Sequence, residues 1–199
     1  MFQNCYGTGM ARPKAFDEDR VLDAAMRAFW AAGYESTSTD DLCEATGLGR
    51  SSIYNTFKSK HELFEKTLLR YMTSRTASIV ELLESDLPAR EKIRTLLWRA
   101  AETEPGDPVG CLVVNSTIEL APHDAGIATR LERDQDRRLT ALRQAIEAGQ
   151  RRREIDADKD AATLARFVVA TISGMRVLAR GGADPASLRA IADTALDAI

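Results

Sequence analysis

Apolar residues recur with the 3.6-residue period of an α-helix along almost the whole chain from Phe16 onward. No stretch alternates between apolar and polar residues over enough positions to form a sheet. Acidic or hydroxyl residues begin most of these segments, and glycine or proline often follows them, as helix caps require. The pattern predicts an all-α protein of about nine helices, at residues 17–32, 38–47, 50–57, 59–83, 88–100, 111–120, 127–153, 158–179 and 185–198.

The composition narrows the class of protein. The 199 residues are 44% hydrophobic and carry a net charge of −3, which is typical of a folded globular chain. Three cysteines lie far apart and only two histidines occur, so we expect no disulfide framework, no metal site and no cofactor. No apolar run approaches the ~20 residues of a membrane span, and the first ten residues lack the features of a secretion signal. We therefore expect a cytoplasmic protein without a membrane partner.

Two short helical segments joined by Gly47-Leu48-Gly49 form a helix-turn-helix pattern. The turn needs a residue that can adopt a positive φ, and Gly47 does so without steric cost. A small core is expected to hold the two segments at a fixed angle, and its predicted members are Leu42, Ala45, Leu48, Ile53 and Phe57.

The outer side of the second segment is short, flat and polar. Its predicted members are Ser51, Asn55 and Lys58, with Ser52 and Tyr54 beside them. Between Ala45 and Lys60 the only charged side chains are basic, so the local charge is positive although the whole chain is acidic. Such a surface can enter the major groove of double-stranded DNA, where Asn55 can pair with adenine.

This stretch resembles the TetR family of bacterial transcriptional regulators. The matching segments are FWAAGY at 29–34, TSTDDL at 37–42, GLGRSSIY at 47–54 and FKSK at 57–60. The resemblance implies phosphate contacts at Thr39 and Lys60, and a DNA-facing set of Arg50, Ser51, Ser52, Tyr54, Asn55 and Thr56. Gly49 stands where the family often has serine, and Asn55-Thr56 replaces a commoner histidine-rich pair, so the base preference stays open.

The last two predicted helices are amphipathic, and Ser173-Gly174 allows a close helix crossing. Such helices can pair with those of a second copy as a four-helix bundle, and the resemblance implies the same homodimer. Two heads about 34 Å apart would read a pseudo-palindromic operator. We therefore expect a flexible or misassigned leader at 1–11, a DNA-binding head at 12–58, a connecting helix at 59–84, and an effector-binding and dimerisation domain at 85–199.

A ligand cavity is expected among the middle helices, where apolar bulk is mixed with a few polar groups. The predicted effector-binding residues are Trp98, Cys111, Asn115, Glu119, Phe167 and Met175, and each also fits an ordinary core position. Cys111 lies near a helix start, where the helix dipole favours a thiolate. The tract Gly110–Asn115 is also similar to one in a branch of the family whose members include electrophile sensors.

The sequence thus predicts a ligand-responsive regulator, a repressor that a small, largely apolar effector releases from its operator. Redox or electrophile sensing through Cys111, activation in place of repression, and a helical adaptor are the alternatives. The adaptor explains the amphipathic helices but not the polar face described above. An enzyme is not expected, because Pro122 separates Glu119 from His123 and no GxSxG or phosphate-binding loop occurs.

Overall fold

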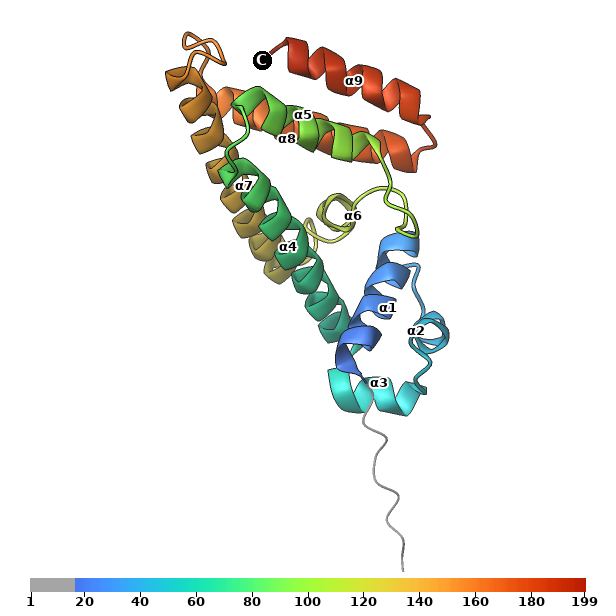
Figure 1. Cartoon of the computed structure of the whole chain (residues 1–199). Helices are drawn as coiled ribbons and strands as arrows, with labels where there is room; N and C mark the ends of the chain where they lie inside the picture. The colour runs from blue at the N-terminus through green and yellow to red at the C-terminus, as the bar shows by residue number, and fades with distance from the viewer. Residues whose placement is uncertain (1–16) are drawn as a thin grey trace, which may run out of the picture.

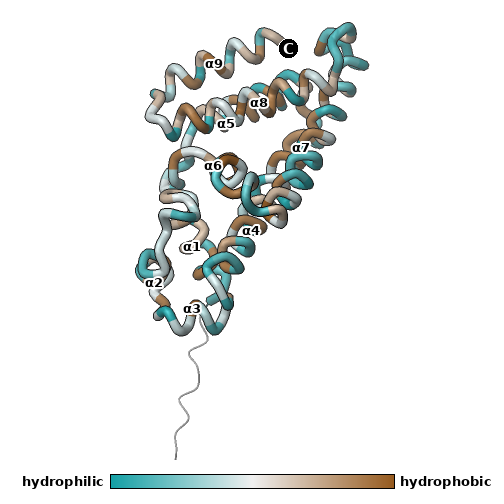
Figure 2. Tube along the Cα trace, turned by 180° about the vertical axis from the view of Figure 1, so that it is seen from behind, coloured by the Kyte–Doolittle hydropathy of each residue, from teal (hydrophilic) through white to brown (hydrophobic). Residues whose placement is uncertain are grey.

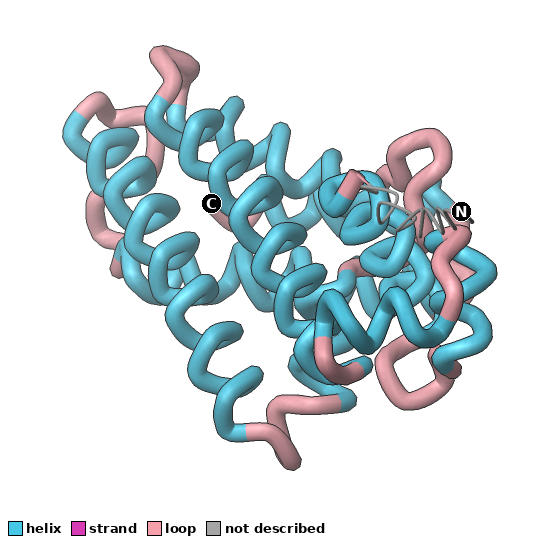
Figure 3. Tube along the Cα trace, turned by 90° about the horizontal axis from the view of Figure 1, so that it is seen from below, coloured by secondary structure: helices cyan, strands magenta, loops and turns pink. Residues whose placement is uncertain are grey.

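The computed structural model describes residues 17–199, so the predicted leader at 1–11 lies outside the described residues. Over that range the chain forms helices and no strand, which confirms the predicted all-α fold (Figures 1 and 3). The helices are α1 (Glu18–Ala32), α2 (Thr39–Thr46), α3 (Arg50–Phe57), α4 (Lys60–Glu84), α5 (Ala89–Ala101), α6 (Leu112–Glu119), α7 (Ala125–Arg151), α8 (Ala161–Arg180) and α9 (Pro185–Asp197).

Side-chain caps set where most helices begin. Ser38 and Asp41 form a capping box at α2, and Asp184 accepts a hydrogen bond from the Ser187 N–H ahead of Pro185 at α9. At α4, Ser59 accepts a hydrogen bond from the Glu62 N–H, and the Glu62 carboxylate lies 4.0 Å from Nζ of Lys58. The caps therefore explain why the predicted helix starts fall within a few residues of the observed ones.

The head consists of α1, α2 and α3 packed on the start of α4. Leu42, Ile53 and Phe57 are fully buried in its core, as predicted, and Gly47 ends α2 in the left-handed conformation with φ of 71°. Leu48 is partly buried, whereas Ala45 is exposed and was wrongly assigned to the core. Thr46, four residues after Leu42, takes the second buried position of α2 instead.

The core of the head continues into the body. Leu112 and Val113 of α6, and Ile127 and Leu131 of α7, belong to the same buried cluster as Phe29 of α1. A second buried cluster joins α5, α7, α8 and α9. Figure 2 shows hydrophobic segments gathered where α4, α6, α7 and α8 approach one another. Because α4 packs along α7 and both run from one cluster to the other, the head and the body are firmly connected (Figure 1).

Helix α8 is long and apolar. By length and composition alone it is apolar enough to cross a membrane, with a mean hydropathy of 1.4 over its best window, and it is the one such helix within residues 17–199. One side of α8 packs on α5, α7 and α9. The other side leaves Phe167, Val177 and Leu178 exposed. This helix is therefore apolar on two sides, of which the body covers one.

Candidate functional site

The outer face of α3 lies at the end of the molecule far from α9 (Figure 1). Ser51, Tyr54 and Asn55 are exposed, and Ser52 and Thr56 are partly buried. The fully buried Ile53 and Phe57 anchor the opposite side of the helix. Because the N-cap residue of α3 is Gly49, no capping side chain accepts a hydrogen bond from the N–H groups of its first turn. The helix thus presents short polar groups and backbone donors outward.

Tyr54 is held in place by the start of α2. Its hydroxyl lies 2.9 Å from Oγ1 of Thr39, so two residues predicted to contact DNA from different helices meet directly. Thr56 donates from its hydroxyl to the Ser52 carbonyl oxygen at 2.9 Å, within α3 itself. The contact with Thr39 places the Tyr54 hydroxyl beside the start of α2.

Arg50 and Lys60, the two cations that the resemblance assigns to DNA, are less free than the sequence indicates. Nη2 of Arg50 lies 3.0 Å from Oδ1 of Asp40, and both side chains are mostly exposed. Nζ of Lys60 lies 4.4 Å from the centre of the Tyr34 ring and donates to the Glu35 carbonyl oxygen at 3.4 Å. An exposed ion pair contributes little stability. A phosphate can therefore displace Asp40 from Arg50 at small cost.

The turn between α1 and α2 is fastened to the body. The Glu119 carboxylate accepts hydrogen bonds from the N–H groups of Tyr34 and Glu35, at 3.0 and 2.8 Å. Arg180 of α8 donates to the carbonyl oxygens of Trp30 and Ala31, at 3.1 and 3.2 Å. These contacts join the end of α1 to both α6 and α8.

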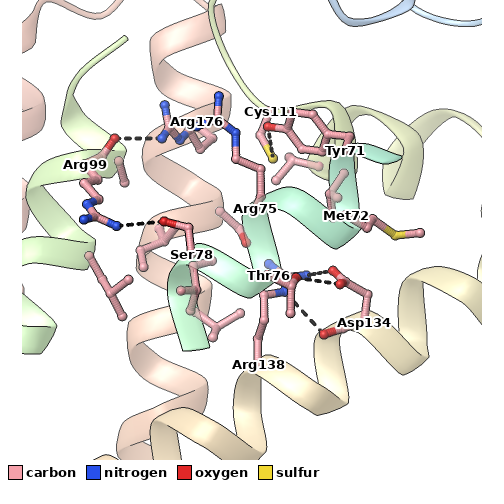
Figure 4. A pocket seen from close by; sticks show the side chains of 18 of the residues that line it. Tyr71, Met72, Arg75, Thr76, Ser78, Arg99, Cys111, Asp134, Arg138 and Arg176 are labelled. Carbon is pink, nitrogen blue, oxygen red and sulfur yellow. Dashed lines mark hydrogen bonds and ion pairs between the residues drawn. The ribbon is translucent and has the colours of Figure 1, made fainter. Parts of the chain in front are cut away.

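A cavity of about 380 Å³ opens between α4, α5, α7, α8 and the loop before α6 (Figure 4). Its apolar wall includes Ile79, Leu83, Leu96, Leu142, Val169 and Ile172. Its polar side chains include Arg75, Thr76, Arg99, Asp134 and Arg176. Trp30 of the head also lines it, so the cavity reaches α1 directly. This mixture of apolar wall and a few polar groups is typical of a small-molecule site.

The tyrosine and cysteine of the cavity face each other. The Tyr71 hydroxyl donates toward Sγ of Cys111 at 3.6 Å. Burial raises the pKa of Tyr71 well above its ordinary value, and the neighbouring Cys111 adds to the effect. The phenol therefore stays protonated as a donor. Arg75 lies over the rings of Trp30 and Tyr71, with its guanidinium carbon 5.7 and 5.6 Å from their centres.

Of the predicted effector-binding residues, Cys111 alone lines this cavity. Trp98 is half exposed and donates to Asp193 at 3.0 Å, and Met175 is buried in the body core. Phe167 lies on the exposed side of α8. The side of α8 that lines the cavity carries Val169, Ile172, Ser173 and Arg176 instead. The sequence favoured Phe167, on the opposite side of the helix, because α8 is apolar on two sides.

Asn115 and Glu119 do not line this cavity and bond to the head instead. Nδ2 of Asn115 donates to the Trp30 carbonyl oxygen at 3.5 Å, and Glu119 binds the turn after α1. Both residues thus join α6 to the head. Sequence reasoning missed Trp30, Tyr71, Arg75 and Arg176 at the cavity, since arginines on amphipathic helices are ordinarily solvated and aromatic residues at helical spacing are ordinarily core.

Comparisons with known proteins cover nearly the whole chain. Residues 21–67 match the family model described as bacterial regulatory proteins, tetR family, and residues 89–195 match the tetracyclin repressor-like C-terminal domain. The HTH-type transcriptional repressor ComR of Escherichia coli is 35% identical over 195 residues, which cover 96% of this chain and 93% of ComR. An uncharacterized HTH-type transcriptional regulator of Bacillus subtilis, YezE, is 30% identical over 193 residues, 96% of this chain and all of YezE.

A solved structure shows the same arrangement of helices. A cysteine mutant of the TetR family transcriptional regulator CifR, complexed with 26-bp double-strand operator DNA, has a TM-score of 0.83 and 30% identity. The match covers 94% of this chain and 98% of that one. This chain belongs to the tetR family of bacterial regulatory proteins, and it is a transcriptional regulator, not an enzyme.

Proposed function

We propose that this protein is a cytoplasmic, ligand-responsive repressor that binds a pseudo-palindromic operator through α3. The observation that carries the proposal is the outward display of Ser51, Tyr54 and Asn55 on a helix whose other side is fully buried. The hydroxyl and amide groups of these residues suit base edges and phosphates in a major groove. The similarity to a regulator solved with operator DNA, and to a named repressor, supports the same function.

The exposed apolar side of α8 supports a homodimer. Phe167, Val177 and Leu178 lie on this side, and Gly174 between them has no atom near its position for a Cβ. A helix that exposes apolar residues around a glycine is suited to close packing against a second helix. Dimerisation through α8 and α9 places two heads on one duplex, and binding the second head then becomes an intramolecular step.

Effector binding in the cavity is the step that lowers the affinity of the heads for DNA. Trp30 connects the cavity to α1, and α4 runs from the cavity to the end of α3. An effector that lowers DNA affinity a hundredfold must favour the non-binding arrangement of the heads by ~2.8 kcal/mol, and equal binding to both arrangements does nothing. A small, largely apolar compound that moves Trp30 or α4 meets this requirement.

DNA binding is tested by fluorescence anisotropy with labelled duplexes from the region upstream of the gene. We expect one duplex to bind far more tightly than a scrambled duplex of equal length. The affinity should fall with salt with a logarithmic slope of about −4 to −7, as for roughly five to eight neutralised phosphates. A helical adaptor would bind neither duplex, and equal affinity for both duplexes would contradict sequence-specific operator binding.

A second candidate response is electrophile sensing by Cys111. Its sulfur lines the cavity and accepts from Tyr71, so a thiol-reactive molecule that enters the cavity meets it. N-ethylmaleimide, which adds to a thiolate through carbon, tests this function. If alkylation releases DNA from the wild type and from Cys43→Ser but not from Cys111→Ser, Cys111 is the sensor. Release from all three proteins would contradict that role.

A further inference from the structure

In the cavity lining, every carboxylate forms an ion pair, but two of the arginines form none within the part of the chain that the structure describes. Every carboxylate that lines the cavity has an arginine within 4.0 Å. These pairs are Glu102 with Arg189 at 2.7 Å, Glu104 with Arg75 at 2.8 Å, Asp107 with Arg75 at 2.5 Å and with Arg27 at 3.1 Å, and Asp134 with Arg138 at 3.0 Å. The negative charges of the lining are therefore already neutralised by protein groups.

Two arginines that line the cavity, Arg99 and Arg176, have no carboxylate within 4.0 Å among residues 17–199. Arg176 donates to the carbonyl oxygens of Glu102 and Arg99, at 3.0 and 2.7 Å, and Arg99 donates to Oγ of Ser78 at 3.4 Å. A guanidinium carries five N–H donors, so both groups keep donors to spare. Figure 4 shows Arg75, Arg99 and Arg176 extending toward the cavity from α4, α5 and α8.

The side chain of Trp30 adds a hydrogen-bond donor that has no acceptor within residues 17–199. This side chain is 4% exposed and lines the cavity, and its indole N–H is buried without an acceptor among the described residues. Buried polar groups nearly always have a hydrogen-bond partner, so an orphan N–H beside a cavity points to a ligand that carries the acceptor. In the described range, the cavity thus has two arginines without a carboxylate partner and an indole N–H without an acceptor, within an apolar wall.

We propose that the effector is an amphipathic organic anion, an aliphatic or aromatic carboxylate. Its charge is balanced by Arg99 and Arg176, and its apolar part lies against the wall formed by residues such as Leu96 and Ile172. An oxygen of the ligand accepts from Trp30. This inference rests on the proposed function and sharpens it, since it assigns a charge to an effector that the sequence describes only as largely apolar.

The proposal also explains how the signal reaches the head. Trp30 belongs to α1, and its carbonyl oxygen accepts from Arg180 of α8. An anion that binds the Trp30 indole pulls on the helix that supports α2 and α3. The ligand therefore acts on the head through a direct contact and not only through α4.

The test is calorimetric titration of the full chain, without DNA, with decanoate and 3-phenylpropionate and with their uncharged primary amides. We expect at least one acid to bind about tenfold to a hundredfold more tightly than its amide, as for loss of a charge-assisted hydrogen bond. Arg99→Gln should remove most of this preference, because Arg99 makes a single side-chain bond in the fold. Arg143→Gln, at an exposed arginine of α7, is the matched control and should keep the preference.

Trp30→Phe tests the indole N–H while keeping a ring in the core. We expect it to weaken binding of the acid severalfold without changing the Arg99 effect. Equal affinity for acid and amide, tighter binding of the amide, or no binding of either acid at about 1 mM would overturn the proposal. If no acid binds but operator DNA does, this inference fails while the proposed function stands. If the acids bind as expected but no DNA is bound, the proposed function fails alone.

Discussion

The carboxylate of Glu119, at the end of α6, accepts a hydrogen bond from the backbone N–H of Tyr34 at 3.0 Å. A Cβ on Gly33, the preceding residue, would lie 3.1 Å from Oε2 of Glu119, and its φ of 95° excludes most other residues. At the other end of α6, the N-cap residue is Cys111, which lines the cavity. Helix α6 therefore spans the distance between the cavity and the turn that positions α2.

Replacement of Glu119 should weaken this connection. Glu119→Ala leaves two backbone N–H groups without their charged acceptor, so we expect the free energy of unfolding to fall by about 1–3 kcal/mol. Urea titration followed by circular dichroism measures the change. The control is Glu132→Ala, at an exposed residue of α7 with no hydrogen bond or ion pair within the described range. Equal midpoints for the two variants would show that the contact contributes nothing.

A charge on the exposed side of α8 should separate the two copies. Val177→Glu places a carboxylate where the proposed dimer buries apolar surface, and an unpaired buried charge is costly. Sedimentation velocity should show a monomer, and DNA affinity should fall because the heads no longer act together. Leu87→Glu, at an equally exposed apolar residue before α5, should remain a dimer. A dimeric Val177→Glu variant would place the interface elsewhere.

Acid should unfold the protein through its helix caps. The hydroxyl and N–H of Ser187 donate hydrogen bonds to the Asp184 carboxylate and lower its pKa below the ordinary 3.8. Hydrogen bonds from Thr163 lower the pKa of Asp160 in the same way. A carboxyl whose pKa is lowered by folding stabilises the fold above its unfolded pKa and loses this effect as the pH falls through its folded pKa. The melting temperature should therefore fall as the pH drops from about 5 toward 2.

The double variant Asp160→Asn and Asp184→Asn keeps capping side chains that do not titrate. Its melting temperature, measured by calorimetry, should depend less on pH in the same range. Asp136→Asn serves as the control, because Asp136 is exposed and makes no hydrogen bond or ion pair in residues 17–199. If the double variant and the control show the same acid dependence as the wild type, other carboxyls govern acid unfolding.

Sequence reasoning predicted the head well because its signals are local. A capping box at Ser38, a left-handed Gly47 and two buried residues on α3 determine which side of that helix faces outward. The pairing of Arg50 with Asp40 escaped prediction, because it depends on the angle between α2 and α3.

The cavity was predicted poorly for a physical reason. The helical period shows which residues share a face, but not which of two apolar faces turns inward, and α8 is apolar on both. The sequence pattern indicates that Arg176 is a solvated surface residue. Its bonds to the carbonyl oxygens of Arg99 and Glu102 appear only when α5 and α8 are packed together.

The most direct test of the account is the operator affinity of a variant with Ser51→Ala, Tyr54→Ala and Asn55→Ala, measured by fluorescence anisotropy at fixed salt. The matched control changes Glu132, Gln135 and Thr140, exposed residues of α7, to alanine. Circular dichroism first confirms that both variants are folded, and sedimentation velocity confirms that both are dimers. We expect the α3 variant to lose at least about a hundredfold in affinity, since each base contact contributes about 1–3 kcal/mol, and the control to bind as the wild type does. Wild-type affinity in the folded α3 variant would contradict the account.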